Sequence, residues 1–438
     1  MQCLRVPAQR QVWKARVLMI FRNFLAWAQT APAASRAEGA SALARAYLEA
    51  ELSEEDRSDA EIALTSLLDD PAISVRRALA IELAGSPYAP RHVISALASD
   101  QSGISVPVLS RSPLLSEAEL CDCAVIGDVY AQAAIALRPG LPEAVAWVIA
   151  DRGEREAVIS LAVNLCAYLA EPILGRILER HGEDGEVREA ILARGDLPAS
   201  IRSDLVTATA NALSSFVISA GWMTAERAGR TCRETLESGV VEIAAGELQT
   251  GNLQVGGNLP LGLVHHLRQQ EQLTPALILR GLLSGNRSLF EATLCELSGQ
   301  GPERVKGFVA AWSGAGFAAL YARANLPPGL LPVFRAALAA QDDYGLIYVA
   351  EQRPQLSKLL IEGTLRALEA MAGPPLGRVI ALLHRLRAEV ARTEARAMST
   401  ELIASSMATT LAPPVENPPA IALELEAGAE ADELAVAA

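Results

Sequence analysis

The residues that could open successive helices recur at a nearly constant spacing along this chain. Pro90, Ser116, Pro142, Pro172 and Pro198 follow one another at steps of 26, 26, 30 and 26 residues. Proline suits the first turn of a helix because its missing N–H would have no intrahelical partner there. Each step has room for two helices of about ten residues joined by a tight turn. The spacing predicts a tandem array of helical hairpins and constrains the fold more than any other feature.

A second stretch shows the same spacing after an interruption. Pro275, Pro302 and Pro328 are 27 and 26 residues apart. Residues 205–272 lack the period and are typical of longer amphipathic helices. We therefore expect two arrays joined by a connector of longer helices.

The first helix of a repeat has a pattern of its own. After Asp70, the apolar residues Val75, Leu79 and Leu83 fall four apart on one helical face, with Arg76 just inside the helix. An acid followed by Val-Arg resembles the HEAT-type repeat, in which an Asp and an Arg link neighbouring units. The prediction is an all-α fold, a HEAT-like α-α superhelix or solenoid of short helical hairpins.

Composition agrees with a helical fold. Apolar residues make up 51% of the chain but aromatic residues only 4%, a mixture that favours closely packed helices over strands. We divide the chain into a possible over-called N-terminal extension before Met19 (1–18), a first array (19–204), a connector (205–272), a second array (273–355), C-terminal helices (356–411) and a disordered acidic tail (412–438).

Charge and cysteine content narrow the functional classes. The formal net charge of −13 makes nucleic acid an unlikely partner, because phosphate contacts need many Lys and Arg side chains. The six cysteines are scattered without paired spacing, which suits reduced thiols in the cytoplasm. No segment approaches the roughly 20 uninterrupted apolar residues of a membrane span, so no membrane association is expected.

Several segments resemble a known family. They include FLAWAQTAPAASRAEGASALARAYLEAELSEEDRSDAEIALTSLLDDPAISVRRALAIELAG in the first array and LVHHLRQQEQLTPALILRGLLSGNRSLFEATLCELSG in the second. Over residues 19 to about 345 the chain resembles an uncharacterised alphaproteobacterial domain-of-unknown-function family with HEAT-like helical repeats. The resemblance implies the fold and a start near Met19, and it brings no catalytic residue, cofactor or substrate.

The sequence carries none of the common catalytic or metal-binding motifs. Walker A, GxSxG, HExxH and paired CxxC motifs are absent, so we predict no catalytic residue, no cofactor and no metal. His265, His266 and Arg268 form a small polar cluster and are the candidate contacts for a partner or ligand, although satisfied surface histidines are the simpler interpretation.

Three tryptophans, Trp147, Trp222 and Trp312, recur on apolar helix faces. Core packing is the expected role, with an interface anchor as the alternative.

The functional hypothesis follows from the fold. Stacked hairpins leave a long exposed surface, and such surfaces usually bind protein. We expect a non-catalytic scaffold or regulatory adaptor that binds an unknown protein partner on its concave surface. The alternatives are a small-molecule sensor that uses the central connector as a hinge, and an enzyme of unrecognised type with a site near His265.

Overall fold

The structure is a computed structural model that describes residues 24–195, 197–249, 260–344, 353–369 and 377–411. These ranges hold α-helices, two short 3₁₀ helices and connecting turns, and no strand. The predicted all-helical class is confirmed there. The predicted extension (1–18) and acidic tail (412–438) lie outside the described residues.

The chain divides into two compact units, unit 1 (Met1–Leu277) and unit 2 (Ile278–Ala438). The division falls five residues after the expected end of the connector, within the helix α16 (Pro275–Leu283). Each unit is described by itself below.

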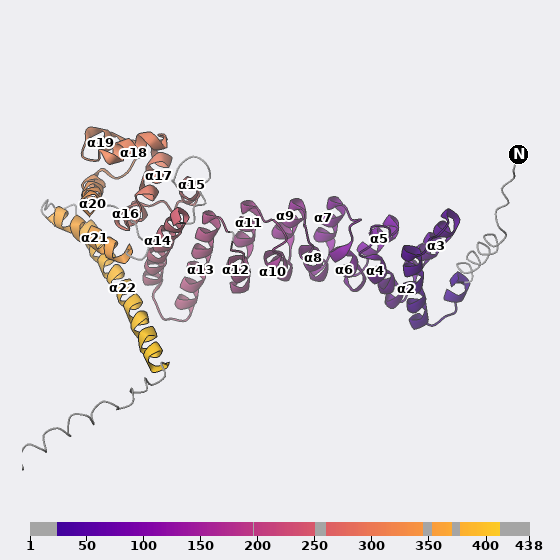
Figure 1. Cartoon of the computed structure of the whole chain (residues 1–438). Helices are drawn as coiled ribbons and strands as arrows, with labels where there is room; N and C mark the ends of the chain where they lie inside the picture. The colour runs from indigo at the N-terminus through magenta and orange to yellow at the C-terminus, as the bar shows by residue number, and fades with distance from the viewer. Residues whose placement is uncertain (1–23, 196, 250–259, 345–352, 370–376, 412–438) are drawn as a thin grey trace, which may run out of the picture. The chain divides into compact units, whose positions relative to one another are not determined.

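Most helices of unit 1 lie in two rows (Figure 1). Each helix of the first row contacts the next helix of the same row. We call this set row A: α2 (Ala33–Glu49), α4 (Ile73–Leu83), α6 (Ser102–Arg111), α8 (Val129–Ala136), α10 (Arg155–Val163) and α12 (Gly185–Leu192).

The second row alternates with the first along the sequence. Contacts link α7 to α9, α9 to α11 and α11 to α13. We call this set row B: α5 (Arg91–Ala98), α7 (Glu117–Ile126), α9 (Glu143–Arg152), α11 (Glu171–His181) and α13 (Ala199–Ser219). Because short turns join the two rows, helices within one row run in the same direction.

Other helices complete unit 1. Between α2 and α4 the chain forms α3 (Glu54–Ser66) and the 3₁₀ helix η1 (Leu67–Asp69). After α13 come α14 (Ala225–Gln249), which packs along α13, and α15 (Leu261–Gln269), which also contacts α13. The lengths of α13 and α14 agree with the longer helices expected in the connector.

The predicted helix starts of the first array are confirmed. Pro90, Pro142 and Pro198 are the N-cap residues of α5, α9 and α13, and Pro172 is the second residue of α11. Ser116 opens α7 with a capping box, in which its side chain accepts from the Glu119 N–H and its own N–H donates to the Glu119 carboxylate.

The second array behaves in the same way. Pro275 and Pro302 are the first residues of α16 and of α18 (Pro302–Ala310). Pro328 opens the 3₁₀ helix η2 (Pro328–Leu330), which leads into α20 (Leu331–Tyr344). The regularly spaced prolines and Ser116 therefore mark helix starts in both predicted arrays.

The core of unit 1 is one continuous cluster that runs between the rows. It extends from Ala40 to Leu205 and is built from aliphatic side chains and many alanines. Small side chains let the helices approach closely, so short helices can cover one another's apolar sides.

Unit 2 has a separate, aromatic core. Phe290, Phe317, Tyr321 and Phe334 are fully buried, and the rings of Phe290 and Phe334 stack at 5.6 Å between centroids. The remaining helices of the unit are α17 (Arg287–Ser298), α19 (Ala315–Arg323), α21 (Arg353–Glu369) and α22 (Gly377–Leu411).

Candidate functional site: an apolar face along row A

An exposed aliphatic side chain follows the buried pair of most row A helices. In α8, Ile135 and Ala136 are buried, and the next residue, Leu137, is 55% exposed. Because the row A helices contact in succession and run the same way, equivalent residues line up along the row. The equivalents of Leu137 are Ile81 in α4, Ser110 in α6, Val163 in α10 and Leu192 in α12.

The middle of this line, on α6, α8 and α10, is poor in charge. No charged residue occurs from Ser102 to Ser110, from Val129 to Leu137 or from Ala157 to Leu165. Tyr130 is 69% exposed. We define the row-A face by the exposed or half-buried residues Val106, Ser110, Tyr130, Ala133, Leu137, Ile159, Val163 and Leu192.

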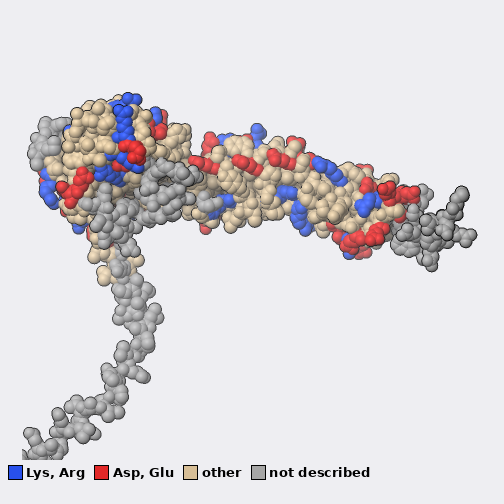
Figure 2. All heavy atoms as spheres, turned by 45° about the horizontal axis from the view of Figure 1, so that its top comes forward, with Lys and Arg blue, Asp and Glu red and all other residues tan. Residues whose placement is uncertain are grey.

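The outer side of row B is different. Figure 2 brings that side of unit 1 toward the viewer and shows acidic and basic side chains distributed along it. The exposed residues there include Arg91, His92, Glu117, Asp122, Glu143, Arg152 and Glu179. The described part of row B thus carries exposed charged residues on each of α5, α7, α9 and α11, whereas the stretches of α6, α8 and α10 given above carry none.

Ion pairs hold row A helices in register. Arg36 of α2 binds Asp70 ahead of α4, with Nε–Oδ2 and Nη2–Oδ1 distances of 2.7 and 2.9 Å. Arg76 of α4 binds Asp100 ahead of α6 in the same bidentate way. The Arg36 hydrogen bond holds the pKa of Asp70 below its usual value. Such pairs fix both the distance and the relative orientation of neighbouring helices, because the planar guanidinium donates two parallel hydrogen bonds to the carboxylate.

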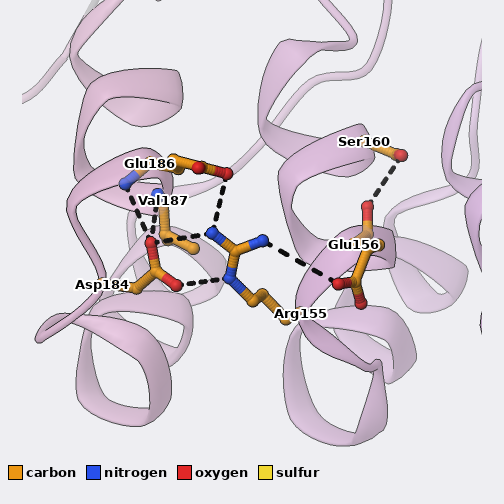
Figure 3. Close-up of polar contacts among 6 residues, drawn as sticks. All are labelled: Arg155, Glu156, Ser160, Asp184, Glu186 and Val187. Atoms are coloured by element: carbon orange, nitrogen blue, oxygen red, sulfur yellow. Dashed lines mark hydrogen bonds and ion pairs between the residues drawn. The ribbon is translucent and has the colours of Figure 1, made fainter.

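The best-connected of these links joins α10 to α12 (Figure 3). Arg155 Nε lies 2.5 Å from Asp184 Oδ2, and its Nη2 lies 2.7 Å from Glu186 Oε2. Asp184 is also the N-cap of α12, because it accepts from the N–H groups of Glu186 and Val187. The Arg155 hydrogen bond lowers the pKa of Asp184, and the two carboxylates raise the pKa of Arg155. One carboxylate therefore starts a helix and ties it to its neighbour.

A second set of contacts closes the carboxyl ends of the helices. Arg138 donates to Leu109 O and Ser112 O at the end of α6. Asn164 donates to Ala136 O at the end of α8. In each case the side chain comes from one repeat further along the chain, so the row-A face rests on a rigid, locally bonded layer.

Arg194 repeats this contact after α12. The residue is 7% exposed, and its guanidinium donates to the carbonyl oxygens of Ala162, Asn164 and Ala167 at distances of 3.2, 3.0 and 2.9 Å. The carboxyl end of α10 is thereby closed by a single buried side chain.

At its C-terminal end the row-A face borders an apolar groove. A cavity of about 540 Å³ is lined by α12, α13 and α14. Leu192 belongs to both the groove and the row-A face. The size is within the roughly 300–1,000 Å³ of ligand-binding pockets.

Beyond the groove, the last turn of α13 and the loop that follows it carry an exposed aromatic pair. Phe216 and Trp222 are 55% and 71% exposed, and their rings meet edge to face at 5.4 Å. Two aromatic rings held together in solvent are typical anchors of protein interfaces.

The predicted contact residues His265, His266 and Arg268 all lie on α15. His266 Nε2 lies 2.7 Å from Asp204 Oδ1 of α13, and this hydrogen bond raises the pKa of His266. His265 and Arg268 are exposed, and His265 Nε2 lies 2.9 Å from Gln269 Nε2 of the same helix. The structure assigns His266 a helix-to-helix contact, and the role of the three as partner or ligand contacts stays a prediction.

Core packing was the wrong expectation for two of the tryptophans. Trp147 is 42% exposed on the outer side of α9, and Trp222 is 71% exposed. Trp312 is half-buried, and its Nε1 donates to Asp342 Oδ2 at 2.7 Å. Helical periodicity identifies an apolar side of a helix without showing whether another helix covers it.

Neither a metal-binding cluster nor a membrane-spanning helix occurs among the described residues. No group of three or more His, Cys, Asp or Glu side chains is placed to hold a metal ion in those ranges. In the same ranges, no helix combines the length and the apolar character that crossing a bilayer requires.

The row-A face was missed from the sequence, although a signal was present. Leu137 and Val163 are 26 residues apart, which is one repeat step. An alignment of the repeats by their apolar pairs, rather than by their prolines, places an aliphatic residue after four of the five pairs from α4 to α12.

Comparison with known proteins gives one match. A family described as an uncharacterised protein conserved in bacteria (DUF2336) matches residues 104–353, more than half of the chain. Neither a curated protein nor a solved structure matches.

Proposed function

We propose, from the premise that the chain belongs to the bacterial family DUF2336, that this protein is a non-catalytic scaffold or regulatory adaptor that binds another protein. Its helical hairpins form a HEAT-like solenoid, and the partner lies against the row-A face. We place the protein in the cytoplasm, where the scattered cysteines would stay reduced.

One observation carries this proposal. Four of five successive row A helices expose an aliphatic side chain at the equivalent position, and no charged residue occurs in the stretches of α6, α8 and α10 that lead to this position. An apolar surface kept in contact with water costs free energy unless a partner covers it, because burial contributes roughly 25 cal/mol per Å² of apolar area. The exposed Phe216 and Trp222 extend the same character beyond α12.

The local bonding of row A supports the same function. Ion pairs such as Arg155–Asp184 fix the helices relative to one another, so the exposed aliphatic side chains keep constant spacing. A surface ordered before binding loses less conformational entropy when a partner docks.

The test changes the row-A face while leaving the core intact. The double substitution Leu137→Glu with Val163→Glu places two charges on exposed positions of the face. The matched control, Ala118→Glu with Ala144→Glu, adds the same charges to exposed positions of row B. Each full-length protein is used as bait in the source bacterium, and captured proteins are identified by mass spectrometry.

We expect the row-A variant to lose a partner that the parent and the row B variant both retain, with all three proteins melting within a few degrees of one another. Retention of the whole partner set by the row-A variant, or loss of the same partner by the row B variant, would contradict the proposal.

A further inference from the structure

The groove beside Leu192 arises where the regular packing of row A stops. Successive row A helices contact each other from α2 to α12. The next helix on that side, α14, instead packs closely on α13, and a Cβ added at Gly239 would lie 3.0 Å from Val206 Cγ1. The cavity lies between α12 and α14, with α13 as its floor.

The floor and walls of the groove are apolar. The side chains that give it this character are Leu192, Leu205, Val206, Ala210, Leu213 and Ile243. Leu192 and Leu213 are 65% and 59% exposed, whereas Leu205 and Ala210 are buried beneath them. A segment that filled the groove would therefore cover surface that now faces water.

The groove has the length of a short helix. Its α13 residues run from Arg202 to Leu213 at helical spacing, which corresponds to about 16 Å or three helical turns. An amphipathic helix laid along α13 would meet this surface with apolar residues at positions i, i+3 or i+4, and i+7. It would also occupy the place in row A that α14 leaves open.

The charged groups at the groove indicate the polar side of such a helix. Arg188 and Arg202 line the groove, and Glu189 is the one carboxylate among its lining residues. Arg188 Nη1 donates to Gly182 O at 2.7 Å, which fixes the guanidinium at the edge of α12. The lining residues themselves therefore sum to one positive charge, which favours a segment that carries carboxylates beside its apolar stripe.

We propose that this groove binds an amphipathic helix of about three turns from the protein partner, with Leu-like residues on one side and flanking acidic residues that face Arg188 and Arg202. The proposal rests on the proposed function, because it names the part of the partner that docks next to the row-A face. A small apolar molecule in the groove is the competing occupant.

The experiment places a photoreactive benzoyl-phenylalanine in the full-length chain expressed in the source bacterium. It replaces Leu213 in the groove, Leu137 on the row-A face, or Ala144 on row B as the control. After irradiation, the cross-linked adducts are mapped by mass spectrometry. We expect the Leu213 probe to capture one segment with aliphatic residues at i, i+3 or i+4 and i+7 and with flanking Asp or Glu.

A blocking variant tests the groove itself. Thr209 lines the groove and is exposed, so Thr209→Trp fills the groove without disturbing the core. We expect at least a tenfold loss of cross-linking from Leu213 and full retention of cross-linking from Leu137. Ser215→Trp, at an exposed position of α13 outside the groove, should leave both unchanged.

The outcomes separate this inference from the function on which it rests. Capture at Leu137 with no capture at Leu213, or capture at Leu213 of a lipid, a metabolite or a basic or extended segment, overturns the helix proposal and leaves the scaffold function standing. Unchanged cross-linking from Leu213 in Thr209→Trp overturns it as well. If neither Leu137 nor Leu213 captures a protein above the Ala144 control, both proposals fail.

Discussion

Single carboxylates in unit 1 accept several hydrogen bonds, and Glu119 is the clearest example. It accepts from the N–H and the hydroxyl of Ser116 at 2.8 and 2.6 Å, and from the Ser95 hydroxyl at 3.0 Å. The hydrogen bonds from Ser116 contribute most to lowering the pKa of Glu119 from 4.5 to about 2. The carboxylate thus joins α5 to α7 and caps α7 at the same time.

The lowered pKa gives a pH-dependent prediction. A depressed folded-state pKa stabilises the protein above pH 4.5, and this contribution is lost as the pH falls towards 2. Glu119→Gln should lower the free energy of unfolding by about 1 kcal/mol at pH 7, and by progressively less as the pH falls below 4.5. Urea unfolding of the parent and the variant, at pH 7 and at a pH below 4.5, measures the difference in the free energy of unfolding. The control is Glu117→Gln, at an exposed position of the same turn, which should change the free energy of unfolding at pH 7 by no more than about 0.5 kcal/mol.

For His266 we expect the opposite pH dependence of stability. Its hydrogen bond to Asp204 raises the pKa of the imidazole, so the stabilisation is complete below the ordinary pKa of about 6.5 and is lost as the pH rises through the raised value. Asp204→Asn should cost about 1 kcal/mol at pH 5.5 and less at pH 9. Thermal unfolding gives the stabilities, and an NMR titration should show His266 titrating above the ordinary histidine pKa of about 6.5. A cost that grows with pH would contradict this assignment.

Helix ends are the next level of organisation, and Arg194 shows how they are closed. It donates to three carbonyl oxygens at the end of α10 while being nearly inaccessible to solvent. Arg194→Leu should lower the free energy of unfolding by about 3 kcal/mol, because buried carbonyl groups lose their donors. Arg194→Lys should recover only part of this loss, because a lysine ammonium cannot reproduce the planar set of donors that the guanidinium offers to the three carbonyl oxygens.

The control for Arg194 is Arg152→Leu, because the Arg152 side chain is 70% exposed. Its cost should stay within about 0.5 kcal/mol in the same urea unfolding measurement. Equal costs for Arg152→Leu and Arg194→Leu would show that the contacts to α10 contribute nothing specific.

Helix starts could be predicted from the sequence, whereas these closures could not. Pro90, Pro142 and Pro198 act locally, through the geometry of the first helical turn, so their positions are visible in one dimension. Arg194 reaches carbonyl oxygens 27 to 32 residues earlier in the chain. That contact depends on how two repeats pack, which no local pattern specifies.

The candidate site could be predicted even less. Leu137 and Val163 have the same residue types as the core, and only the position of the next row A helix decides that they face solvent. The same ambiguity makes the expected burial of Trp147 and Trp222 wrong. The polar cluster on α15 was visible because His265, His266 and Arg268 are close in sequence, but the partner of His266, Asp204, is 62 residues away.

At the scale of the whole molecule, contacts within unit 1 are mostly between neighbours. Arg76 links α4 to the start of α6 through Asp100, and Arg155 links α10 to α12 through Asp184. When each helix contacts mainly its neighbours, stability is approximately a sum of local terms, and opening in one region need not spread to another. The two links therefore allow a matched test of how far a perturbation travels.

Hydrogen exchange in the full-length chain measures this directly. Arg76→Ala should accelerate amide exchange about tenfold in α4 and in the turn before α6, because it removes the bidentate contact to Asp100 and the hydrogen bond to Asp70 O. Exchange in α10 and α12 should not change. Arg155→Ala should show the reverse pattern. Equal acceleration throughout unit 1 in either variant would mean that the two rows open as one cooperative block. The row-A face would then depend on the folding of the whole array and not on contacts between neighbouring helices.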